Sequence, residues 1–217
     1  LSGKHLPVPA LRRNYLRIVD RLGLGDHLPG DLWEDTWSGG AELGNPRNPY
    51  LGLRPFGTHD RDSFFGREEE SRRLARAVLE RREAAGHGLV VVLGASGCGK
   101  SSLLAAGLIA TETIDGLLAG WTVAQLSVAE LAQAAALDAD LVMIDQAEEL
   151  FAVEEDPSAA LRMLEELAGR AVVVMAMRAD AFAAAIQEPV LADAVARPFL
   201  IAPRRHDEIR EVILGPA

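Results

Sequence analysis

The chain has 217 residues, of which 49% are hydrophobic, and it carries a formal net charge of −10 at pH 7. This length suits one α/β domain with a small appendage, and the apolar content is sufficient for a core. The acidic balance argues against nucleic-acid binding, which needs a basic surface, but it does not exclude a basic protein partner. The single cysteine excludes an internal disulfide framework and a cysteine-based metal site.

No apolar run approaches the ~20 residues that span a bilayer, and the first residues lack the layout of a signal peptide. We therefore expect a cytoplasmic protein that makes no membrane contact.

Residues 1–45 differ in composition from the rest of the chain. The apolar spacing over 10–22 predicts a helix. Trp33 and Trp37 lie four residues apart, and we interpret them as packing residues rather than as a binding site. Because this segment is too short for a core of its own, we expect a helical linker or the end of an upstream effector domain, followed by the main domain over 46–217.

Two aromatic residues, Phe64 and Phe65, precede Gly66 and a polar helix. Leu74 and Val78 give this helix a narrow apolar stripe. The two phenylalanines have two interpretations: they pack in the core, or they form a wall beside a nucleotide base.

The strongest signal is the loop Gly-Ala-Ser-Gly-Cys-Gly-Lys-Ser at 94–101, which fits the pattern G-x-x-x-x-G-K-[ST]. The apolar run 89–93 predicts a buried strand before it, and 102–106 predicts a helix after it. Glycines let successive N–H groups point at one anion, and the helix adds its positive end. We predict a phosphate site in which Lys100 reaches the β- and γ-phosphates and Ser101 binds Mg²⁺. The alternative is a loop that keeps this shape and binds nothing.

A second apolar run, 140–144, ends on Asp145. It predicts a buried strand that delivers a carboxylate at its C-terminal end, where ligands bind in parallel sheets. We expect Asp145 to hold Mg²⁺, directly or through water. Glu148 and Glu149 follow, either in a solvated loop or orienting water near the γ-phosphate, and we favour the second interpretation.

The apolar run 171–177 predicts another buried strand, which ends at Arg178. If this strand lies between the two described above, the arginine would lie between the phosphate loop and Asp145 and sense the γ-phosphate. The alternative is a surface ion pair with Asp180. The remaining patterns predict strands at 121–126 and 199–202 and helices at 100–109, 128–136, 156–168 and 206–214.

Five motifs in order resemble those of the novel STAND NTPase domain, a bacterial branch of the signal-transduction ATPases with numerous domains that is often fused to WD-repeat arrays. They are Y-x-G-L-R-P-F at 50–56, F-F-G-R-E at 64–68, the phosphate loop with a doubled serine, D-Q-x-E-E-L-F at 145–151 and R-A-D at 178–180. The resemblance covers roughly residues 48–217.

The resemblance implies an α/β fold, the P-loop NTPase core of the additional-strand type, with parallel sheet order 5-1-4-3-2 and flanking helices. It implies a Walker A loop, a Walker B aspartate at Asp145, a sensor arginine at Arg178 and a place beside adenine for residues 64–68. It also implies an ATP/ADP switch, whose nucleotide state controls formation of a homo-oligomer and activation of an effector. Effector and sensor domains would then be partners within the full-length protein.

The chain departs from the family pattern at Ala95, Cys98 and Ala147, where proline, serine and phenylalanine are common. Gln146 stands where many relatives in the wider ATPase class place glutamate. We therefore expect weak or lid-dependent ATP hydrolysis. Two alternatives remain: a non-hydrolysing, nucleotide-bound scaffold, and the ATPase part of a transcription regulator.

The expected site has three groups of residues. Those expected to be catalytic are Glu148, Glu149 and Arg178, and those expected to bind Mg²⁺ are Ser101 and Asp145. Those expected to bind ATP or ADP are Phe65, Gly66, Arg67, Gly94, Ser96, Gly97, Cys98, Gly99, Lys100, Ser101 and Ser102.

Overall fold

The computed structural model describes residues 51, 54–85, 88–109, 116–152, 157–204 and 206–214. The chain divides into two units, Leu1–Arg47 and Asn48–Ala217, and the second contains all of the described residues. The helix expected within residues 1–45 lies outside them.

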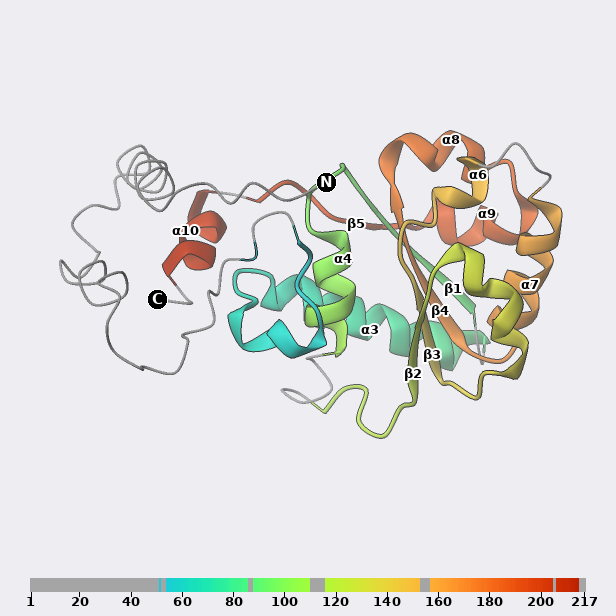
Figure 1. Ribbon diagram of the computed structural model, residues 1–217, viewed down its shortest axis with the longest axis horizontal. Coiled ribbons are helices and arrows are strands. Elements are labelled where there is room, and N and C mark those ends of the chain that lie inside the picture. Colours follow the sequence, from blue (N-terminus) through green and yellow to red (C-terminus); the bar gives the residue numbers. More distant parts are fainter. Residues whose placement is uncertain are drawn as a thin grey trace, which may run out of the picture. The chain divides into compact units, whose positions relative to one another are not determined.

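Five parallel strands form the centre of the domain (Figure 1). Their order across the sheet is β2-β3-β4-β1-β5, which is the predicted order 5-1-4-3-2 seen from the other edge, so the predicted fold class is confirmed. The strands are β1 (Gly88–Gly94), β2 (Val123–Leu126), β3 (Leu141–Ile144), β4 (Val172–Arg178) and β5 (Phe199–Leu200).

Helices cover both faces of this sheet, α3 and α4 on one side and α7 and α9 on the other (Figure 1). The first group comprises α3 (Glu68–Ala85), α4 (Lys100–Ser102) and the π-helix η3 (Leu103–Leu108), and the second comprises the 3₁₀-helix η4 (Val128–Ala136), α6 (Glu149–Ala152), α7 (Ser158–Ala168) and α9 (Pro189–Ala196). The other elements are the 3₁₀-helices η2 (Thr58–Ser63) and η5 (Ala179–Ala181) and the helices α8 (Phe182–Ala185) and α10 (His206–Leu214). Among the described residues, no helix is long and apolar enough to cross a bilayer.

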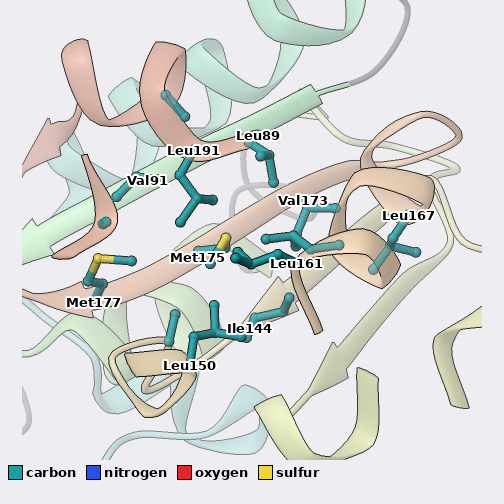
Figure 2. Close-up of a cluster of buried hydrophobic side chains, with 14 of the residues drawn as sticks. Leu89, Val91, Ile144, Leu150, Leu161, Leu167, Val173, Met175, Met177 and Leu191 are labelled. Atoms are coloured by element: carbon teal, nitrogen blue, oxygen red, sulfur yellow. The ribbon is translucent and has the colours of Figure 1, made fainter. Parts of the chain in front are cut away.

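The central strand β4 contributes to a hydrophobic core on each face. Successive side chains of a strand point to opposite faces. Accordingly, Val173 and Met175 lie in the cluster beneath α7 and α9 (Figure 2), whereas Val172 and Val174 lie in the cluster beneath α3. The side chains that α7 turns toward the sheet, Leu161, Leu164 and Leu167, are buried in the first of these clusters.

Several elements differ from the sequence-based expectations. The last strand, predicted over 199–202, ends at Leu200. The strand predicted from Trp121 begins only at Val123, because Thr122 is hydrogen-bonded to Asp140 instead of continuing the ladder. The helix predicted at 128–136 is a 3₁₀-helix, and Arg170 donates to carbonyl oxygens at its C-terminal end. The helix that follows the phosphate loop has π geometry from Leu103 to Leu108.

A polar cluster of Arg82, Trp121, Thr122 and Asp140 links the N-terminal ends of β2 and β3 to α3. The Asp140 carboxylate accepts hydrogen bonds from the Thr122 backbone N–H and hydroxyl, both at 2.9 Å, and from Arg82 at 3.2 Å. The Arg82 guanidinium also lies 4.2 Å from the centre of the Trp121 ring, a cation–π contact. The hydrogen bonds from Thr122, followed by the positive charge of Arg82, hold the pKa of Asp140 below its ordinary value.

We expect Asp140→Asn to lower the free energy of unfolding by about 1 kcal/mol near pH 7, because it removes the charge that these donors stabilise. A carboxyl whose pKa is lowered by folding stabilises the protein above its unfolded pKa, and this contribution is lost as pH falls through the folded pKa. Urea unfolding of the wild type between about pH 7 and pH 3 should therefore show a steeper loss of stability than unfolding of the variant. Asp138→Asn, which changes an exposed neighbour, is the control; equal pH dependence in the wild type and Asp140→Asn would contradict the assignment.

Candidate functional site

The phosphate loop joins the C-terminal end of β1 to the start of α4. Gly97 and Gly99 adopt positive φ angles of 74° and 93°, which other residues adopt only with strain. The Lys100 side chain folds back into the loop, where its ammonium donates to the carbonyl oxygens of Gly94 at 3.0 Å and Ala95 at 2.9 Å. Lys100 is only 9% exposed. The loop is therefore closed around a positive charge, as an anion site requires.

The guanidinium of Arg67 is hydrogen-bonded to the backbone of the phosphate loop. The side chain is 2% exposed, and its Nη2 donates to the carbonyl oxygens of Cys98 at 3.1 Å and Ala202 at 3.0 Å. The Cys98 carbonyl and the Gly99 N–H belong to one planar trans peptide, so they point in opposite directions. Because the Cys98 carbonyl points toward Arg67, the Gly99 N–H points away from Arg67. Its place in the structure is consequently that of a support for the loop backbone.

A second arginine, Arg204, holds the segment that precedes α3. Its Nη1 donates to the carbonyl oxygens of Phe65 at 3.1 Å and Gly66 at 3.4 Å. Burial, followed by the positive charge of Arg67, lowers the pKa of Arg204 below its ordinary value. The two arginines thus link the phosphate loop, the start of α3 and the chain that follows β5.

Phe64 and Phe65 have different environments. Phe64 packs against the core beneath α3, and its ring centre lies 5.9 Å from that of Phe56. Phe65, in contrast, lines a cavity of about 470 Å³ together with Glu68, Arg210, Glu211 and Leu214. The core interpretation therefore describes Phe64, and Phe65 remains available to a ligand.

Ser101 and Ser102 differ in their contacts. The Ser102 hydroxyl is buried and accepts a hydrogen bond from the Phe56 backbone N–H at 3.1 Å, so it ties the preceding segment to the start of α4. Ser101 is half-buried at the first turn of the helix. Of the two hydroxyls, that of Ser101 is the better placed to bind a metal ion.

The carboxylates after β3 separate into two roles. The Glu148 carboxylate accepts a hydrogen bond from the Arg178 backbone N–H at 3.1 Å. Glu149 and Asp145 instead line a second cavity, of about 290 Å³, with Gln146 and residues at the C-terminal end of β2 and just after it. Glu149 is therefore the carboxylate that faces open space beside Asp145.

Arg178 is the last residue of β4, at the C-terminal edge of the sheet. β4 runs between β1 and β3, and Arg178 is the register partner of Gly94, the first residue of the phosphate loop. Its guanidinium makes the alternative ion pair with Asp180 that the sequence suggested. The side chains of Arg178 and Asp180 are 48% and 63% exposed, so this pair is open to solvent.

The donors at this edge of the sheet fit a magnesium ion. Hydroxyl and carboxylate oxygens, here from Ser101 and Asp145, are the hard ligands that Mg²⁺ prefers. No group of three or more histidine, cysteine, aspartate or glutamate side chains able to hold a metal occurs among the described residues. In phosphate-binding sites, Mg²⁺ is usually held by one or two protein oxygens together with substrate phosphates.

Sequence reasoning did not identify Arg204 as part of the site. Two adjacent arginines, Arg204 and Arg205, follow the last strand, and nothing in their spacing distinguishes the one that reaches Phe65 and Gly66.

The sequence matches the family described as Novel STAND NTPase 1 over residues 49–139 and 122–217. The chain belongs to this family. It is thus a STAND-class P-loop NTPase domain, as the order of its motifs predicted. No curated protein matches the sequence significantly.

Several solved structures of the replication initiator DnaA are similar to this domain. Domain III of the Thermotoga maritima protein is 13% identical, with a TM-score of 0.46, 76% of this chain and 74% of that chain being covered. AMPPCP-bound DnaA from Aquifex aeolicus is 19% identical, with a TM-score of 0.43 and coverage of 76% and 54%. DnaA bound to AMPPCP and single-stranded DNA is 18% identical, with a TM-score of 0.44 and coverage of 74% and 54%. The chain thus spans about half the length of the last two proteins.

Gly66 is expected to be sensitive to substitution. Its φ is +73°, and an added Cβ would lie 2.9 Å from the Glu208 carbonyl oxygen and 3.2 Å from Arg204 Nη1. We expect Gly66→Ala to lower the free energy of unfolding by about 1–3 kcal/mol in urea titrations, because of both strain and overlap. Gly169→Ala is the matched control, since Gly169 has a φ of −73° and its added Cβ would have no atom closer than 3.4 Å. Equal effects of the two substitutions would show that the close approach at Gly66 is not restrictive.

Proposed function

We propose that this domain binds Mg-ATP and ADP and is the nucleotide-controlled switch of a larger signalling ATPase. The observation that carries the proposal is the phosphate loop, whose glycines have positive φ angles and whose lysine ammonium is folded inside it. A polyphosphate in this loop would replace the two carbonyl oxygens as the partner of Lys100. The loop N–H groups would bind the β-phosphate.

The base would lie on the side of the loop where α3 begins. Phe65 offers an aromatic surface in a cavity whose volume is about 470 Å³, and Leu214 adds an apolar contact. Arg67 would act on the phosphates indirectly. Its guanidinium donates to the carbonyl oxygen of Cys98 in the loop, to that of Ala202 after β5, and to the Glu70 carboxylate.

Ser101 and Asp145 would hold the magnesium ion. When bound, Mg²⁺ neutralises charge on the β- and γ-phosphates. Asp145 follows β3 and Ser101 follows the loop, so a phosphate chain between them would pass over the end of β4, where Arg178 lies. Arg178 would therefore contact the γ-phosphate.

Hydrolysis would depend on a carboxylate that orients water. Glu149 is the better candidate, because it lines the cavity beside Asp145, whereas Glu148 is engaged with the Arg178 backbone. Turnover is expected to be slow, since Gln146 stands where many ATPases have a glutamate.

The finer biological role follows from the family resemblance. Exchange or hydrolysis of the nucleotide would convert a cytoplasmic monomer into an oligomer that activates an effector. The effector, a sensor and WD repeats would be supplied by other parts of a bacterial protein.

We expect Lys100→Ala to weaken binding of both ADP and ATP by about 10- to 100-fold, the amount that one charge-assisted hydrogen bond to phosphate contributes. Isothermal titration calorimetry measures both affinities. Arg162→Ala, which removes an exposed cation on α7, should leave both unchanged. Unaltered nucleotide affinity in Lys100→Ala would overturn the assignment of the phosphate site.

For the full-length protein, we expect Glu149→Gln to slow ATP turnover by about 100-fold, because an amide cannot act as the base. Glu148→Gln should have a smaller effect, since its amide oxygen can still accept the hydrogen bond from Arg178. The measurement is release of inorganic phosphate under saturating ATP. Turnover that is absent in the wild type would favour the alternative of a non-hydrolysing scaffold, and a larger loss in Glu148→Gln would reverse the assignment.

A further inference from the structure

Asp180 holds the functional group of Arg178 in a two-point contact. The Arg178 Nε lies 3.1 Å from Asp180 Oδ1, and its Nη2 contacts Oδ2. A carboxylate paired in this way occupies one edge of the guanidinium and fixes its orientation. The Nε–Nη2 edge of the guanidinium is thus already occupied by an anion from the same chain.

The backbone of Arg178 is held independently of this ion pair. Its N–H donates to Glu148 at 3.1 Å, and its Cα is in register with that of Gly94 on the neighbouring strand. A change of partner would therefore require only rotation of the side chain, whose 48% exposure leaves it room to turn.

The two partners of Arg178 compete. The guanidinium can present a given pair of N–H groups either to the Asp180 carboxylate or to a phosphate in the loop. Among ATP and ADP, only ATP has the third phosphate that extends from the loop over the end of β4. The Lys100 contact, in contrast, serves both nucleotides.

We propose that Asp180 is a specificity-determining residue that lowers the preference of the domain for ATP over ADP. The γ-phosphate must displace Asp180 from Arg178, whereas ADP leaves the ion pair intact. This inference rests on the proposed nucleotide site. In a nucleotide switch, such a competitor would favour the ADP-bound state at a given ratio of the two nucleotides.

The size of the effect follows from the exposure of the pair. Exposed ion pairs contribute little, because solvent screens them, so removing the competitor should strengthen ATP binding by about two- to fivefold. ADP binding should stay the same. The ratio of the ATP affinity to the ADP affinity would therefore change. A general loss of stability would instead weaken the binding of both nucleotides.

The experiment compares the affinities of ADP and of the non-hydrolysable analogue AMPPCP by calorimetry in the presence of Mg²⁺. The variants are Asp180→Asn, Arg178→Ala and the double variant. Asp193→Asn is the matched control, because Asp193 is another exposed carboxylate that pairs with arginines, here Arg81 and Arg197 on α3 and beyond α9.

We expect Asp180→Asn to tighten AMPPCP binding about two- to fivefold without changing ADP binding. Arg178→Ala should weaken AMPPCP binding, and adding Asp180→Asn to it should have no further effect. An unchanged ratio of affinities in Asp180→Asn, or the same gain in the Arg178→Ala background, would overturn the role of Asp180 while leaving the nucleotide site intact. Absence of binding of either nucleotide to the wild type would overturn both proposals together.

Discussion

The site depends on the position of β4 between β1 and β3. This strand is buried on both faces and hydrogen-bonds to a parallel neighbour on each side, so its backbone groups are satisfied without solvent. Its apolar side chains serve two cores at once, which fixes the register. The same register sets Arg178 beside the first residue of the phosphate loop and separates the loop from Asp145 by the width of one strand. The chemistry at this edge is thus a consequence of how the sheet is ordered.

The second constraint is the burial of an arginine. Removing a guanidinium from water is costly unless its N–H groups find acceptors. Arg67 finds them in Glu70 and in two backbone carbonyls, one from the phosphate loop and one from the chain after β5, while its Nε has no partner among the described residues. The start of α3, the phosphate loop and the chain after β5 are distant in sequence, and all three contact the Arg67 side chain. The conformation of the loop is supported by a buried side chain that binds one of its carbonyl oxygens.

The sequence was sufficient to predict most of the sheet and the location of the loop, because continuous apolar runs and the glycine pattern are local signals. The order of the strands came from the family resemblance, since the position of β4 depends on contacts between segments that are distant in sequence. Local patterns could not separate the roles of Phe64 and Phe65, which differ only in the direction of their side chains. They also could not reveal Arg204, because its partners are backbone oxygens about 140 residues earlier. The tight packing of η3 on α3 is likewise a long-range feature, since an added Cβ at Gly107 would lie 2.5 Å from the Ser71 hydroxyl of α3.

The way in which α10 is attached has an energetic consequence. None of its described side chains is fully buried. The chain that leads into it is held by hydrogen bonds from Arg67 and Arg204 to backbone carbonyls. Elements with few buried apolar contacts open at a lower free energy than the core they adjoin. Detachment of α10 can therefore occur as local unfolding while the five strands stay paired. The wall of the cavity beside Phe65 belongs to a less stable part of the domain than the loop that would hold the phosphates.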